Sequence, residues 1–293
     1  MRKYTLVFIM SLAVVLAACT VKSTKVSGFS SPESVTSDGT FFYVSNVGEK
    51  LAPTERDGDG FISKLTGDGR IDRLRFAEGL NAPKGMAVLG DVLYVADIER
   101  IRGFELKDGH EVFNLDLSGA GTSFLNDITV FSENELLVTA TDIGAVILVR
   151  VGAAPSYQRL ESNIDLAGIN GITFDQSGGN VYFVTFGTDN KPTGFVGSGR
   201  ISGGKFIGRK ICSKEGYYDG IAVHNGKVLA SDWVEFKKSG LLIQVDPESG
   251  SYSNVDLPEK IGGPADFYLD EKGERLWIPM MLENKVLIYG LGN

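Results

Sequence analysis

One short pattern recurs six times along this chain of 293 residues and constrains its fold more than any other feature. Each copy is an alternating apolar and polar segment, then a turn, then a run of β-branched and aromatic residues, which together predict a β-hairpin. The clearest copy runs from Ile169 through a turn at 176–180 to Val184. The second residues of the six copies are 51, 42, 44, 49 and 46 positions apart: Glu33, Lys84, Asn126, Asn170, Asp219 and Ala265.

A repeat of 40 to 50 residues with several short strands in each copy is typical of a β-propeller. The sequence therefore predicts an all-β fold, a single-domain six-bladed β-propeller over residues 31–293. A β-sandwich is the alternative, but it does not predict one hairpin that recurs at this interval. The 37 glycines suit a chain that reverses direction many times.

The first 18 residues have the pattern of a signal peptide. Arg2 and Lys3 precede an uncharged and largely apolar run, Tyr4–Ala18, which is short for a membrane-spanning helix. The small residues before Cys19 resemble the end of a bacterial lipoprotein signal, so we expect Cys19 to be lipidated. The alternative is an ordinary cleaved signal followed by a chance cysteine.

These features predict a location in the bacterial cell envelope, with membrane attachment only through the lipid on Cys19. Thr20 follows that cysteine where an aspartate would favour retention at the inner membrane, so an outer-membrane anchor facing the periplasm is slightly favoured. Residues 19–30 form a tether that ends in an alternating segment, Thr24–Phe29. We expect this segment to close the last blade as its fourth strand and to remove an open sheet edge.

The charge of the chain excludes one class of partner. The formal net charge is −8, and loss of residues 1–18 removes Arg2 and Lys3 but no acid. The mature chain is thus more acidic still, which argues against a nucleic-acid partner.

The second residues of the repeats are the candidate functional site, and we call them the ring residues. In a propeller, equivalent positions of the innermost strands encircle one mouth of the central channel. Two carboxylates and two carboxamides then converge there, an all-oxygen set that suits a hard divalent cation such as Ca²⁺ or Mg²⁺. Alternatively, Asn and Asp before Gly are turn formers, but that preference does not explain Glu33.

The same residues carry a family resemblance. The six repeats, with Pro-Glu, Asn-Asp, Asn-Gly-Ile and Asp-Gly-Ile in the first, third, fourth and fifth copies, resemble the SMP-30/gluconolactonase/LRE-like family. That resemblance implies one divalent cation at the channel mouth, held by Glu33, Asn170 and Asp219, with Asn126 near metal and substrate. It also implies hydrolysis of lactones and related esters.

The chain departs from sugar-lactone members of that family at Phe124, where they carry an arginine that holds the sugar. A sugar lactone is therefore disfavoured, and a more hydrophobic lactone or ester fits better. Lys84 adds a positive charge near these residues. Three roles stay open for its side chain: it binds substrate, it neutralises excess negative charge, or it points to solvent.

Two functions stay open. The first is a metal-dependent lactone or ester hydrolase in which Asp219 is a ligand and the general base, while Asn126 and Lys84 bind substrate. Ca²⁺ is the preferred cation, with Mg²⁺, Mn²⁺ and Zn²⁺ as alternatives. The second is a non-catalytic surface propeller that binds an envelope protein or glycan. An open mouth above the metal favours the enzyme, and a mouth plugged by Trp233, Tyr217 or the segment Gly187–Lys205 favours the binding protein.

Two loops need the structure to interpret them. The segment Glu55–Ile62 contains Asp57 and Asp59 at alternate positions and resembles the middle of a calcium-binding loop, yet a solvated turn is the better interpretation. The segment Gly187–Lys205 is rich in glycine and polar residues, and we expect it to be the longest irregular stretch.

Overall fold

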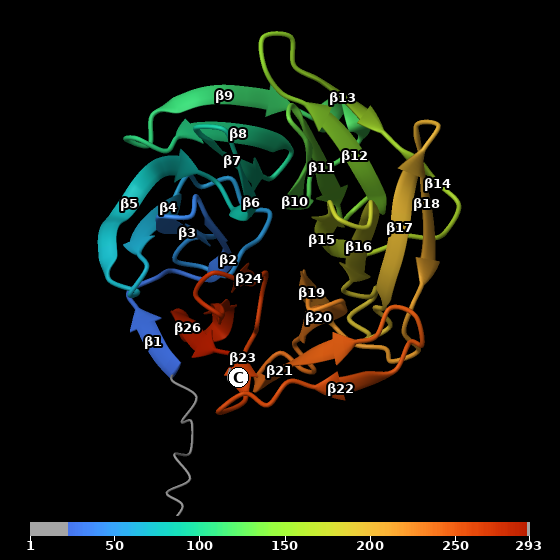
Figure 1. Ribbon diagram of the computed structural model, residues 1–293. Coiled ribbons are helices and arrows are strands. Elements are labelled where there is room, and N and C mark those ends of the chain that lie inside the picture. The colour runs from blue at the N-terminus through green and yellow to red at the C-terminus, as the bar shows by residue number, and fades with distance from the viewer. Residues whose placement is uncertain (1–22, 292–293) are drawn as a thin grey trace, which may run out of the picture.

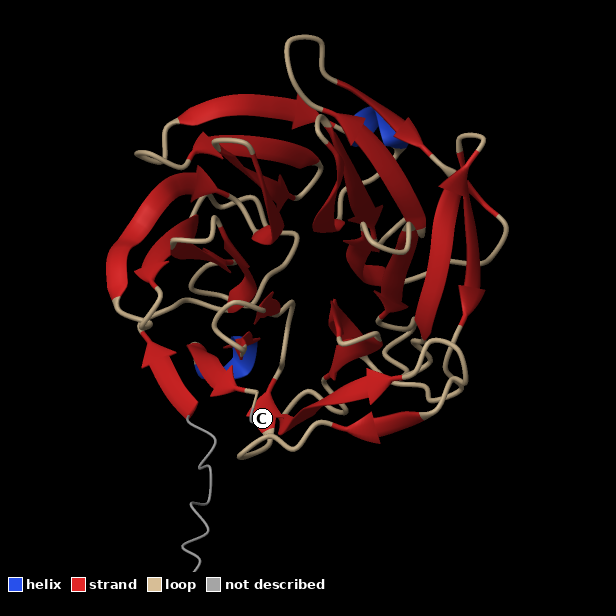
Figure 2. Ribbon diagram, viewed as in Figure 1, coloured by secondary structure: helices blue, strands red, loops and turns tan. Residues whose placement is uncertain are grey.

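Six small sheets form a ring around a central channel (Figures 1 and 2). The structure is a computed structural model, and it describes residues 23–291. The predicted six-bladed β-propeller is thus confirmed. Cys19 and the signal segment lie outside the described residues. No helix among residues 23–291 has the length and hydrophobicity needed to span a membrane.

The first three blades follow one another along the chain, each with four strands numbered from the channel outwards. Their strands are β2 (Pro32–Ser37), β3 (Phe41–Asn46), β4 (Gly60–Thr66) and β5 (Ile71–Leu80); β6 (Pro83–Leu89), β7 (Val92–Asp97), β8 (Arg100–Glu105) and β9 (Glu111–Asp116); β10 (Leu125–Ser132), β11 (Glu135–Ala140), β12 (Ala145–Arg150) and β13 (Ser156–Arg159). A short 3-10 helix, η1 (Ser118–Ala120), joins blades 2 and 3.

Blades 4 and 5 each carry one extra short strand, and blade 6 takes its outermost strand from the start of the chain. Their strands are β15 (Ile169–Asp175), β16 (Asn180–Thr185), β17 (Val196–Ser202), β18 (Lys205–Lys210) and β14 (Glu161–Ser162); β19 (Tyr218–His224), β20 (Lys227–Asp232), β21 (Lys238–Val245), β22 (Tyr252–Asn254) and β23 (Ile261–Gly262); β24 (Tyr268–Asp270), β25 (Arg275–Met280), β26 (Lys285–Gly290) and β1 (Ser23–Ser27). The 3-10 helix η2 (Met281–Glu283) precedes β26.

The ring is closed where the two ends of the chain meet. β1 pairs antiparallel with β26, with Ser23 opposite Tyr289 and Ser27 opposite Lys285. The alternating segment near the N-terminus therefore supplies the fourth strand of blade 6. A further link joins the first and last blades, because the backbone N–H of Ser31 donates to Asn284 Oδ1 at 2.8 Å.

Apolar side chains between neighbouring blades hold the ring together. Between blades 2 and 3, for example, Ile101, Leu125 and Val138 are fully buried in one cluster. Burial of a side chain of this size stabilises a fold by about 1.5–3 kcal/mol. The alternation seen in the sequence thus places the apolar faces of the strands against the neighbouring blades.

All six inner strands run in the same direction through the channel. They begin at one end, which we call the first mouth, and they end in the turns that lead to the second strands. A β-bulge interrupts the pairing of the first five inner strands just after they begin: Pro32/Val35, Pro83/Met86, Leu125/Ile128, Ile169/Ile172 and Tyr218/Ile221. Each of these five bulges contains two residues, a ring residue and the residue that follows it. A bulge bends a strand and re-aims its side chains, so it turns the ring residues toward the first mouth.

Glycine follows the ring residue in three blades because the inner strands approach one another too closely for a side chain. A Cβ on Gly85 would lie 2.4 Å from Asp127 Cα, and one on Gly220 would lie 2.7 Å from Asp266 Cα. At Gly171 the nearest atom would be the carbonyl oxygen of Asp219, at 2.3 Å. Turn formation, the alternative explanation for the Asn-Gly and Asp-Gly pairs, is not their role here, since all three glycines lie within strands.

The expectation that Gly187–Lys205 is irregular is only half correct. Its second half is regular, because Val196–Ser202 forms β17 and Lys205 begins β18. The glycines at 197 and 199 suggest a loop by composition, but they lie in a strand. They lack side chains because the rings of Phe183 and Phe206 lie over them.

Removal of β1 should destabilise the propeller, since it leaves β26 as an open edge and loses the closure of the ring. A chain that starts at Gly28 should melt several degrees below one that starts at Thr20. Thermal unfolding followed by circular dichroism measures this difference. Equal melting temperatures would mean that β1 contributes nothing to closure.

Candidate functional site

Five of the six ring residues line one cavity at the first mouth. Its volume is about 420 Å³, within the range of small-molecule sites. All five side chains are buried, with at most 6% of any of them exposed: Glu33, Lys84, Asn126, Asn170 and Asp219. The sixth, Ala265, is buried and does not line the cavity. The structure thus brings together the residues that the sequence singled out from five different blades.

Four of these residues each present a buried oxygen that has no hydrogen-bond partner: Glu33 Oε2, Asn126 Oδ1, Asn170 Oδ1 and Asp219 Oδ1. Among the described residues only one other buried side-chain atom, Trp277 Nε1, shares this property. An unsatisfied buried polar atom costs roughly 1–3 kcal/mol. Four of them around one cavity make it the candidate place for a ligand that would satisfy them.

The chemistry of this set fits a hard divalent cation. Two carboxylate and two carboxamide oxygens are the ligand types that Ca²⁺ takes, with places left for water or substrate. The set contains no imidazole and no thiolate. Nowhere in residues 23–291 do three His, Cys, Asp or Glu side chains lie close enough to hold a metal ion, so any metal site here needs the amides of Asn126 and Asn170.

The two carboxylate oxygens of Asp219 are unequal. Oδ2 accepts a hydrogen bond from the indole Nε1 of Trp233 at 2.8 Å, whereas Oδ1 is unpaired. Trp233 is itself only 4% exposed, so this bond fixes the orientation of the carboxylate. Oδ1 is therefore the oxygen available to a ligand, and Oδ2 keeps one further lone pair that can accept a proton.

Lys84 is fully buried, at 1% exposure, beside the four oxygens. Its Nζ donates to the carbonyl oxygen of Ala82 at 3.0 Å and lies 4.8 Å from the centre of the Phe124 ring. The Phe124 ring, at the position where the family resemblance places an arginine, thus contacts the ammonium group of Lys84 from blade 2. Because Lys84 is buried, the alternative that it points to solvent is wrong.

Burial dominates the electrostatics of the ring. It raises the pKa of Glu33 well above its usual range, with a further rise from the nearby Asp219 and Asp266 and an opposing effect of Lys84. Burial, with Asp266 as a second cause, likewise raises the pKa of Asp219 to about 8. Burial lowers the pKa of Lys84 to about 8, and Glu33 opposes this. A cation bound among these groups would favour the charged carboxylates.

Hydroxyl side chains on second strands hold the ring in place, and sequence analysis missed them. Thr139 Oγ1 accepts from the backbone N–H of Asp127 and donates to the carbonyl of Asn170, at 2.9 and 2.7 Å. Ser231 Oγ accepts from Gly220 N–H and donates to the carbonyl of Ala265, at 2.7 and 3.1 Å. Each hydroxyl accepts from a backbone N–H inside one bulge and donates to a backbone carbonyl of the next blade, so it links the two blades. A Thr or Ser inside an otherwise apolar second strand is the signal that could have found them.

The loop between β3 and β4 borders the cavity through Leu51 and Pro53. Arg56 anchors this loop to blade 2 through a bidentate pair with Glu99 at 2.6 and 2.5 Å. Asp59 braces it internally, since its Oδ2 accepts from the backbone N–H of Glu49 at 2.9 Å. Because the Asp59 carboxylate is engaged within the loop, the segment Glu55–Ile62 is better interpreted as a turn than as a calcium-binding loop.

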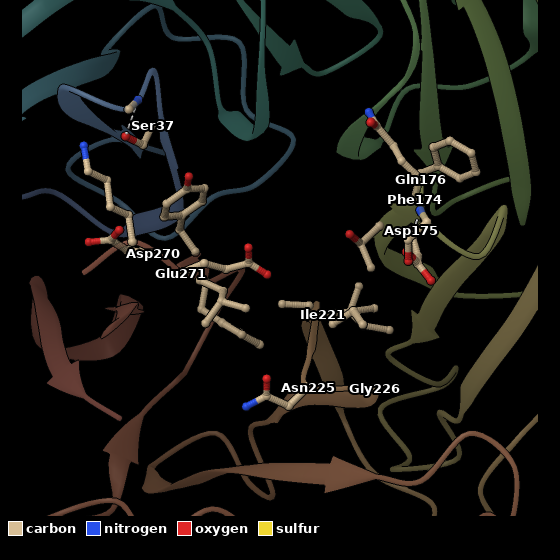
Figure 3. A pocket seen from close by; sticks show the side chains of 18 of the residues that line it. Ser37, Phe174, Asp175, Gln176, Ile221, Asn225, Gly226, Asp270 and Glu271 are labelled. Atoms are coloured by element: carbon tan, nitrogen blue, oxygen red, sulfur yellow. Dashed lines mark hydrogen bonds between the residues drawn. The ribbon is translucent and has the colours of Figure 1, made fainter. Parts of the chain in front are cut away.

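A larger hollow, of about 830 Å³, opens at the opposite mouth, where the inner strands end (Figure 3). Two of its three acidic side chains have partners within their own turns: Asp175 accepts from Ser177 and Asp270 from Arg275. Ser37 in the same hollow donates to the carbonyl of Phe41. No described residue around it presents an unsatisfied buried atom. The smaller cavity at the first mouth is therefore the candidate site.

Comparison with known proteins supports the fold assignment. The sequence matches no protein-family model and no curated protein sequence. Solved structures are nevertheless similar over most of the chain. The gluconolactonase XC5397 from Xanthomonas campestris superposes with a TM-score of 0.69 at 15% identity, covering 93% of this chain and 90% of that one. A luciferin-regenerating enzyme gives 0.66 at 13% identity, with coverage of 93% and 96%.

An auxiliary nutrient binding protein from Bacteroides thetaiotaomicron is similar to the same degree, with a TM-score of 0.67 at 12% identity over 90% of this chain and 69% of that one. At these identities the likeness concerns the fold. The predicted resemblance to propellers of the SMP-30/gluconolactonase/LRE-like type is confirmed at that level, and the activity of this chain must be argued from its own site.

Stability of the metal-free protein should fall as pH rises from about 5 to about 8.5. The pKa values of Asp219 and Asp266 in the folded state are raised to about 8 and about 7, mainly by burial. The folded chain then retains protons that the unfolded chain has released, so this stability is present at low pH and is lost as pH rises through 7–8. Melting temperatures of EDTA-treated protein across this range test the trend.

The matched variant for this measurement is Asp266→Asn, which keeps an oxygen to accept from Ser34 Oγ and cannot ionise. Its melting temperature should depend less on pH. A stability that instead rises between pH 5 and 8.5 in the metal-free wild-type chain would contradict the raised pKa values.

Proposed function

We propose that this chain is a divalent-metal-dependent hydrolase of lactones or related esters, with its site in the cavity at the first mouth. The observation that carries the proposal is the convergence of four unpaired, buried oxygens on one cavity. Glu33, Asn126, Asn170 and Asp219 would hold the cation, and Ca²⁺ fits these oxygen ligands best. Mg²⁺, Mn²⁺ and Zn²⁺ are the alternatives to be tested beside it.

A cation at this position supplies Lewis acidity toward a carbonyl oxygen. The residues of the chain do the rest. Trp233 holds Asp219 so that the free lone pair of Oδ2 accepts a proton from the attacking water. Asn126 orients the substrate through its amide group. Lys84 brings a positive charge to a site where negative charge develops, and the low dielectric of its surroundings strengthens that effect.

The state of the mouth supports catalysis over mere structural metal binding. Trp233, Gly187 and Asn190 line the cavity without filling it, Tyr217 is buried in the adjoining cluster, and about 420 Å³ remains. A small molecule therefore has room beside the residues that carry the four unpaired oxygens. The competing candidate is a binding propeller, and the likeness to an auxiliary nutrient binding protein favours it. Such a protein would bind its ligand or partner without turnover, which the next experiment distinguishes.

The chain should gain stability from a divalent cation and hydrolyse lactones only when it is bound. A ligand at about 100 times its dissociation constant stabilises a fold by roughly 2.7 kcal/mol, which corresponds to about 5 °C or more for a domain of this size. Melting of residues 20–293 after EDTA, with each of the four cations added back, measures the first effect. A pH-stat assay with lactones and aryl esters measures the second.

Glu33→Gln and Asp219→Asn keep the side-chain volumes and should abolish both effects. The matched control is Asp266→Asn, which removes a buried carboxylate that does not line the cavity, and it should keep most of each. A cation-dependent shift without hydrolysis would favour the binding propeller. No shift with any cation would refute the metal site.

We also propose that the mature chain is lipid-anchored in the bacterial envelope through Cys19, with the first mouth directed away from the membrane. β1 runs toward the first mouth, because Ser27 pairs with Lys285 at the start of β26. Its first residue, Ser23, thus lies toward the opposite mouth. Four residues of chain from Cys19 to Ser23 span at most about 14 Å, so a lipid on Cys19 would hold that opposite face near the bilayer.

Cys19→Ser should move the protein from the membrane fraction to the soluble fraction of a bacterial host that expresses the full chain. Cys212→Ala is the matched control, since Cys212 is buried in the apolar cluster between blades 4 and 5, and it should stay with the membrane. Fractionation followed by immunoblotting reads out both variants. Membrane association of Cys19→Ser equal to wild type would contradict the anchor.

A further inference from the structure

Four aromatic side chains pack together on one side of the cavity, and we call them the aromatic wall: Phe186, Tyr217, Trp233 and Phe236. All but Tyr217 line the cavity directly. Their ring centres lie 5.2–6.1 Å apart in five contacting pairs. Aromatic pairs at such distances are mutually stabilising. The wall is therefore a preformed surface and not a set of independently moving side chains.

The polar atoms of the wall are already engaged by the protein. The indole Nε1 of Trp233 donates to Asp219, and the hydroxyl of Tyr217 donates to the carbonyl oxygen of Asn190 at 2.5 Å. Thr141, which also lines the cavity, donates its hydroxyl to the carbonyl of Ile169. The wall thus offers carbon surface and no free hydroxyl or indole donor to a bound molecule.

Apart from Asn190 and Thr141, the other side chains at the cavity rim are apolar as well. Leu51 and Pro53 reach it from blade 1, and Met281 reaches it from blade 6. Leu51 is 46% exposed and Phe236 is 56% exposed, so two large apolar side chains stand at the rim in contact with water. Arg56, paired with Glu99, holds the loop that carries Leu51. Exposed apolar surface beside a polar floor is the usual form of a small-molecule site.

From this arrangement we infer the substrate class, an inference that rests on the function proposed above. The substrate is a lactone or ester that carries an apolar substituent, an alkyl chain or an aryl group. Its carbonyl lies over the four oxygens, and its substituent packs between the aromatic wall and Leu51. A polyhydroxylated lactone is disfavoured because the aromatic wall and Leu51 offer its hydroxyl groups no polar partner in exchange for water.

The expected size of the preference follows from apolar burial. Each methylene that enters such a surface contributes about 0.8 kcal/mol, which is about a fourfold gain in kcat/KM per methylene when transition-state binding includes the chain. The gain should level off once the chain extends past Phe236, which is exposed at the rim, into water.

The test uses residues 20–293 loaded with the cation that raises its melting temperature most. Hydrolysis of γ-butyrolactone, of its γ-alkyl derivatives with one to eight carbons and of glucono-δ-lactone is followed by pH-stat. Phe236→Ala and Leu51→Ala remove the two rim side chains. Leu74→Ala is the matched control, since this leucine is similarly exposed, at 42%, on β5 outside the cavity.

We expect kcat/KM to rise with the length of the alkyl chain. The rise should become clearly shallower in Phe236→Ala and Leu51→Ala, but not in Leu74→Ala. The rates of each variant are divided by its own rate with unsubstituted γ-butyrolactone, so that the comparison concerns only the dependence on chain length. Equal rates across the alkyl series, or a preference for glucono-δ-lactone, would overturn the inference and leave the hydrolase proposal standing. No hydrolysis of any lactone or ester with any cation would overturn both.

Discussion

The β-bulge near the start of the inner strands is the constraint on which the site depends. In a regular strand the side chains at positions 33 and 34 would point to opposite faces of the sheet, and neither would be aimed at the mouth. The extra residue in the bulge breaks this alternation. Repeated around the ring, it brings side chains from five blades into one cavity. Thr139 and Ser231 stabilise this arrangement by satisfying backbone groups that the bulges leave unpaired.

The same geometry concentrates polar groups where water has little access. Four oxygens without partners, a buried lysine and two raised carboxyl pKa values all act against folding of the metal-free chain. Proteins retain such groups at functional sites, where a ligand satisfies them. Trp233 connects this polar floor to the apolar mouth, because its indole nitrogen donates to Asp219 while its rings contact Phe186 and Phe236. One side chain thereby couples the orientation of the carboxylate to the shape of the apolar surface above it.

Much of the fold can be predicted because a propeller repeats one sequence pattern. Turn residues and alternation recur at the blade interval, so Glu33, Asn126, Asn170 and Asp219 are recognisable as equivalent positions from the sequence alone. The errors fall where tertiary packing overrides local composition. Gly197 and Gly199 suggest a loop but belong to β17, where Phe183 and Phe206 occupy the space of their missing side chains. The sequence leaves Lys84 between three roles, because burial of a lysine cannot be inferred from its neighbours along the chain.

The sequence by itself determined the number of blades, the strand that closes the ring and five residues that line the cavity at the first mouth. These features depend on local patterning and on the spacing of the repeat. Only the tertiary structure decided which oxygens lack partners, that Trp233 occupies one oxygen of Asp219, and that four aromatic rings from blades 4 and 5 form a wall beside them. The physical reason is that hydrogen-bond satisfaction and ring packing are relations between segments tens of residues apart. Local patterning carries no information about those distances until the ring has closed.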